Sequence, residues 1–101
     1  MKLPETIQVC GEDYKIKLNP ASTGGEFDTL KRVIVIGSYD KLKIPAILIH
    51  ELLELVFATR NLRYSKEVLN PDNGDYLFSF NHEEFNQAAE DFCHTIKGIK
   101  F

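Results

Sequence analysis

Apolar and polar residues alternate near the start of the chain, at positions 7–9 and again at 14–18. A period of two predicts strands with one buried face, and the Gly11-Glu12-Asp13 segment between them suits a tight turn. Residues 19–25 are rich in Asn, Pro, Ser, Thr and Gly, which predicts a loop. The apolar run within residues 32–37 is typical of a buried strand. The first third of the chain is therefore expected to form a small sheet.

Two helices and a hairpin are predicted in the rest of the chain. The first helix should run from about residue 45 to residue 61, where apolar residues dominate. The second should run from about 82 to 97, because Asn81 and Glu84 have the spacing of a capping box at its start. Residues 70–74 between the helices are all strong turn formers, and they predict a β-hairpin.

This order of elements predicts one α+β domain over residues 1–101, with a small, mostly antiparallel sheet and two main helices. The chain has 101 residues, of which 44% are hydrophobic and 27% charged, as in an ordinary globular domain. Its formal net charge of −3 counts against nucleic acid and anionic membranes as partners, since both attract a positive surface. We therefore expect no nucleic-acid partner and no membrane partner.

The chain carries no pattern of export or membrane insertion. Residues 1–6 lack an apolar signal region, and no apolar run approaches the ~20 residues that span a bilayer. Cys10 and Cys93 are far apart and form no CxxC motif. A soluble cytoplasmic protein with reduced thiols is the expectation.

The residues that indicate chemistry lie in the first predicted helix. On a helical wheel His50 and Glu54 are one turn apart, and Glu51 lies alongside them. Leucine and isoleucine flank this polar stripe on both sides, which predicts a helix buried around most of its circumference. Because an unpaired buried carboxylate is costly, a divalent cation held by His50 and Glu54 would explain the pattern. Glu51 could then polarise a metal-bound water.

Other interpretations of this spacing stay open. A histidine and a glutamate at i and i+4 also form an ordinary helical side-chain pair. For a metal site, His82 is the best third ligand, since it is expected in the first turn of the last helix. Two imidazoles and one carboxylate match the ligands of catalytic zinc sites, so Zn²⁺ is the expected cofactor, although manganese, iron or nickel also suit them. Lesser candidates for the third ligand are Glu83, Glu84 and Glu90.

Three segments together resemble a known family. Residues 23–27 (Thr-Gly-Gly-Glu-Phe), the apolar run 33–36 and residues 47–54 (Ile-Leu-Ile-His-Glu-Leu-Leu-Glu) are similar to small zincin-like metallopeptidases, many of them encoded by phages and other mobile elements. In that family an HExxH or HExxE helix follows an extended strand, and a residue of a later helix completes the site. The resemblance covers residues 24–96, and the HELLE segment is its specific part.

The resemblance implies a metal-dependent hydrolase in which His50, Glu54 and His82 bind the metal and Glu51 is the general base. The chain departs from the family in having Glu54 where most zincins have histidine. The implied substrate is a peptide or protein, bound along a sheet edge that strand 33–36 is expected to supply. The alternative is a non-catalytic zincin-like module for binding or regulation, with or without metal. A homodimer could supply the missing wall of a cleft.

Overall fold

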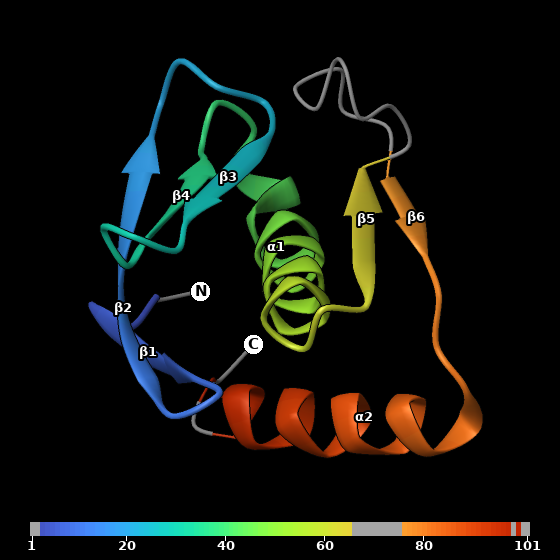
Figure 1. Cartoon of the computed structure of the whole chain (residues 1–101). Helices are drawn as coiled ribbons and strands as arrows, with labels where there is room; N and C mark the ends of the chain where they lie inside the picture. The colour runs from blue at the N-terminus through green and yellow to red at the C-terminus, as the bar shows by residue number, and fades with distance from the viewer. Residues whose placement is uncertain (1–2, 66–75, 98, 100–101) are drawn as a thin grey trace.

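The computed structural model describes residues 3–65, 76–97 and 99, and a four-stranded sheet forms one side of it (Figure 1). The strand order is β1-β2-β4-β3. Strands β1 and β2 pair antiparallel, β2 and β4 parallel, and β3 and β4 antiparallel, so the predicted α+β class with a mostly antiparallel sheet is confirmed. The strands are β1 (Thr6–Val9), β2 (Glu12–Asn19), β3 (Gly25–Asp28) and β4 (Val33–Gly37).

The turn between β1 and β2 consists of Cys10 and Gly11, which have φ angles of 50° and 84°. Two-residue turns with positive φ match the twist of the flanking strands, and glycine adopts this conformation without strain. The turn thus begins one residue before the predicted Gly11-Glu12-Asp13 segment, because Glu12 already pairs with Val9.

Strand β3 is the element that the sequence pattern does not predict. It has four residues, and Phe27 is its one apolar side chain, so the alternation is too short to be recognised. Its pairing with β4 overturns one expectation. Strand 33–36 is hydrogen-bonded on both sides and is not a sheet edge. Within the described part of the chain, β3 is the edge of the sheet on that side.

The helices confirm the two that were predicted, with small shifts at their ends. A short 3₁₀ turn, η1 (Lys41–Lys43), leads into α1 (Ile44–Thr59), and α2 is His82–Ile96. The capping box is present: Glu84 N–H donates to Asn81 Oδ1 at 2.8 Å, and Asn81 N–H donates to Glu84 Oε1 at 3.0 Å. Helix α1 ends two residues earlier than predicted, before Asn61, whose φ of 59° is left-handed.

Helix α1 lies between the sheet and a second, two-stranded sheet, and α2 crosses beneath them (Figure 1). Strands β5 (Arg63–Ser65) and β6 (Tyr76–Phe78) pair antiparallel, as the hairpin prediction requires, and the predicted turn at 70–74 lies outside the described residues. No helix in the described ranges is long and apolar enough to cross a bilayer. The fully buried core side chains come from β1, β4 and α1: Val9, Ile34, Ile36, Leu48, Leu52, Leu55 and Val56.

Candidate metal centre

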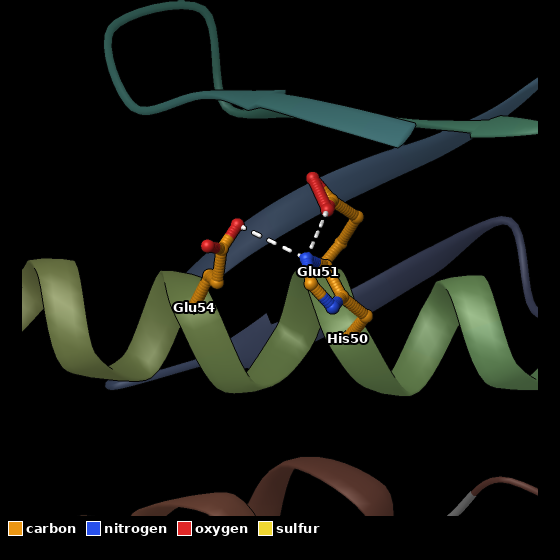
Figure 2. Close-up of side chains that lie close together, drawn as sticks. All are labelled: His50, Glu51 and Glu54. Carbon is orange, nitrogen blue, oxygen red and sulfur yellow. Dashed lines mark ion pairs between the residues drawn. The ribbon is translucent and has the colours of Figure 1, made fainter. Parts of the chain in front are cut away.

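Helix α1 presents His50, Glu51 and Glu54 together on the side that faces β3 (Figure 2). One imidazole nitrogen and one oxygen from each carboxylate all lie within 4.8 Å of one another. The spacing explains this convergence, since residues at i, i+1 and i+4 can direct their side chains to one point beside a helix. Among the residues that the structure describes, this is the group of three His, Cys, Asp or Glu side chains that could hold a metal ion.

The three side chains differ sharply in exposure. The Glu51 side chain is 6% exposed, Glu54 is 25% exposed, and His50 is 68% exposed. The group therefore has one buried carboxylate and an exposed imidazole. The helix is buried or half-buried around most of its circumference, as predicted, and is exposed on one face that includes His50. Leu48, Leu52 and Leu55 face the core. Ile49 and Leu53, by contrast, are 37% and 39% exposed.

The two glutamates lie at different distances from the imidazole of His50. His50 Nε2 lies 3.5 Å from Glu54 Oε2 and 4.0 Å from Glu51 Oε2 (Figure 2). Two atoms bound to one tetrahedral zinc at ~2.0–2.1 Å lie roughly 3.4 Å apart. His50 and Glu54 are thus at ligand spacing. Glu51 Oε2 stands about half an ångström farther from His50 Nε2 than Glu54 Oε2 does.

At Gly25, strand β3 passes directly over the buried carboxylate of Glu51. A Cβ atom at this position would lie 2.7 Å from Glu51 Cγ and 3.0 Å from Ile47 Cγ2. Glycine inside a strand commonly marks such a close approach of the backbone to its neighbour. The pocket at the metal group continues along this strand end, lined further by Gly24, Lys43 and Ala46. Sequence reasoning gave Gly25 no role, although the paired glycines were the available signal.

His82 is not part of the group. It is the first residue of α2 and is exposed. Its Nδ1 lies 3.4 Å from the side-chain Nδ2 of Asn86. The third side chain that the structure places beside His50 and Glu54 is Glu51. His82 as a ligand stays a prediction, and it would require the start of α2 to approach the exposed face of α1.

A second polar cluster lies away from this site, where α1, α2 and the β1–β2 turn meet. Arg60 Nε donates to Asp91 Oδ2, and Gln87 Nε2 donates to Asp91 Oδ1 at 3.3 Å. The hydrogen bond from Arg60 lowers the pKa of Asp91, while burial raises the pKa of Cys10, whose Sγ lies 4.0 Å from the same carboxylate. The cluster therefore joins three elements and holds a protonated thiol, which is a poor nucleophile.

Comparison of the chain with protein-family models, with curated proteins and with solved structures finds no match. The zincin-like resemblance accordingly rests on the short segments described above.

Proposed function

We propose that the protein is a metal-dependent hydrolase, a zincin-like metallopeptidase that uses Zn²⁺. One observation carries the proposal: donor atoms of His50, Glu51 and Glu54 gather within 4.8 Å at an open pocket. One imidazole and carboxylates are ligand types that zinc accepts. We also propose a cytoplasmic location, which agrees with two cysteines that are both free thiols.

The roles follow from distance and burial. His50 Nε2 and Glu54 are the ligands, because their 3.5 Å separation suits a shared ion. A zinc ion held by these two residues would supply a water of lowered pKa, near ~7, as the nucleophile. Glu51 would be the general base, positioned beside the two ligands to accept a proton from that water. The Glu51 side chain is only 6% exposed, so it is held in a fixed position beside the pocket.

The edge strand supports a peptide as substrate. Strand β3 ends the sheet in the described part of the chain, so the outer side of its backbone can pair with an extended peptide. Gly25 lies against Glu51, and a peptide paired with β3 would pass close to the proposed base. The sheet edge of the proposal is thus β3, in place of strand 33–36.

Metal analysis of the untagged protein tests the ligands. We expect about one equivalent of zinc per chain, lost on His50→Ala, because one of the two proposed ligands is removed. His94→Ala is the matched control, since His94 is an exposed histidine outside the group, and it should keep the metal. His82→Ala reports on the third ligand in the same assay. Absence of zinc from the wild-type protein, with no change in melting temperature on adding zinc, would refute the proposal.

A Glu51→Gln variant separates the peptidase from the non-catalytic module. The amide keeps the shape of the side chain but cannot act as a base. A peptidase should retain zinc and lose peptide hydrolysis on this change. If wild type and variant both bind zinc and neither cleaves a peptide mixture, the chain is the binding or regulatory module instead.

A further inference from the structure

A second hollow adjoins the metal group, and we call it the aromatic pocket. Helix α1 forms one wall, and the end of β6 with the segment that follows it forms the other. Two of its lining residues, His50 and Glu54, also line the pocket beside Glu51, so the two hollows adjoin each other. The volume of the aromatic pocket is about 360 Å³. Its lining residues are His50, Leu53, Glu54, Phe57, Phe78 and Phe80.

The aromatic walls are fixed by contacts among the rings. Phe57 and Phe80 stack with their centroids 5.4 Å apart, and Phe57 and Phe78 meet edge to face at 5.6 Å. Phe85 stacks behind Phe80 at 5.8 Å. These geometries are favourable for aromatic pairs, so the rings hold one another in place. The pocket therefore exists before anything binds in it.

Large apolar side chains remain open to solvent in this pocket. Leu53 and Phe80 are each 39% exposed, and Phe78 is 46% exposed. An exposed apolar patch on a small domain commonly marks a binding site. Each of these residues would gain from contact with another apolar group, since that contact removes further surface from water.

The size and lining of the pocket select its occupant. A dry apolar cavity of ~150 Å³ accommodates benzene, so the aromatic pocket has room for one phenylalanine, tyrosine or leucine side chain. A charged side chain would lose hydration against Leu53 and the phenylalanine rings, whereas an apolar side chain would gain from the same contact. His50 and Glu54 at the rim would place such an occupant directly beside the reacting part of the substrate.

We propose that the aromatic pocket is the specificity pocket of this site and binds a large apolar side chain, best an aromatic one, of a peptide substrate. The proposal rests on the proposed peptidase function for its role in cleavage. The binding step itself depends only on Leu53, Phe57, Phe78 and Phe80, and it can be measured without any metal.

A matched pair of variants tests the pocket. Leu53→Gln places an amide in its wall, whereas Ile49→Gln makes the same change one turn earlier on α1, outside the pocket. Leu53 and Ile49 are 39% and 37% exposed, so neither change should unfold the domain. The probes are N-acetylphenylalaninamide and N-acetylalaninamide, titrated into ¹⁵N-labelled protein and followed by NMR.

The phenylalanine probe should bind at least ~10-fold more tightly than the alanine probe, because a hydrophobic pocket discriminates even single methylenes. Resonances of residues 53, 57 and 80 should shift. Leu53→Gln should remove most of the preference, and Ile49→Gln should retain it. Equal binding of both probes, or loss of the preference in both variants, would overturn the proposal that this pocket binds a large apolar side chain.

Peptide cleavage distinguishes this proposal from the peptidase proposal. With zinc, wild-type protein should cut a peptide mixture next to Phe, Tyr or Leu, and Leu53→Gln should reduce that preference. Phenylalanine binding without any cleavage would support the pocket and refute the peptidase. Cleavage without an apolar preference would support the peptidase and refute the pocket. A dimer that dissociates on Leu53→Gln, with no probe bound by the wild type, would show that a second copy occupies the patch and overturn the proposal.

Discussion

The close approach of β3 to α1 makes Gly25→Ala the most informative single substitution. The new methyl group would lie 2.7 Å from Glu51 Cγ, whereas carbon atoms in contact normally stay ~3.5–4.0 Å apart. Glu51 would have to retreat by roughly 1 Å to restore that spacing. Its side chain is only 6% exposed, so it cannot simply swing into solvent. The strain therefore falls on the packing between β3 and α1.

The magnitude follows from two opposing effects. Overpacking of a buried position costs about 1–3 kcal/mol, while replacing glycine by alanine gains about 0.4–1 kcal/mol through the unfolded chain. The net loss in unfolding free energy should be about 1–2 kcal/mol. For a domain of this size that corresponds to a fall in melting temperature of about 4–16 °C. A base displaced by 1 Å should also lower any peptide hydrolysis about 100-fold.

Gly24→Ala is the control, because a Cβ on the neighbouring glycine meets nothing within 4 Å. It should change the unfolding free energy by no more than about 0.5 kcal/mol. Thermal unfolding followed by circular dichroism compares the two variants, and zinc titration by calorimetry reports on the site. Equal melting temperatures for Gly24→Ala and Gly25→Ala would refute the close contact between β3 and Glu51.

Two further predictions concern the polar cluster. Because Arg60 lowers the pKa of Asp91, the stability from this pair is present above the unfolded pKa of ~3.9 and is lost as pH falls through the lower folded pKa. Asp91→Asn should therefore flatten the acid side of the urea-unfolding profile, by no more than about 1 kcal/mol for a partly exposed pair. An unchanged acid limb would contradict this reasoning. At pH 8, iodoacetamide should modify exposed Cys93 before Cys10, whose pKa is raised by burial, and mass spectrometry of the peptides would reveal the opposite order.

The sequence predicts the site better than it predicts the surroundings of the site. The convergence of His50, Glu51 and Glu54 follows from helical spacing alone, and helical spacing is a local property. The position of β3 is not local. Its four residues form a strand because they pair with β4. Their own pattern of apolar and polar residues does not predict this pairing. The close approach at Gly25 therefore depends on the packing of β3 against α1, which the local sequence does not determine.

The exposed face of α1 is also not predictable from local pattern. Leucine and isoleucine on both sides of the polar stripe indicate a helix surrounded by protein. In a chain of 101 residues there is too little material to cover both sides, and Leu53 is left at the surface. An apolar residue that the core cannot cover becomes available for binding, and periodicity alone does not distinguish these two uses.

The helix that carries the metal group is also the helix that fills the core. Leu48, Leu52 and Leu55 are fully inaccessible to solvent and alternate along α1 with the three polar side chains. Amide protons in the middle of such a helix exchange with solvent mainly when the whole domain unfolds. The proposed ligands therefore cannot be released by local fraying, and zinc binding should slow hydrogen exchange throughout the core. By contrast, Phe78 and Phe80 are partly at the surface, and opening of their segment would remove one wall of the aromatic pocket while leaving α1 folded.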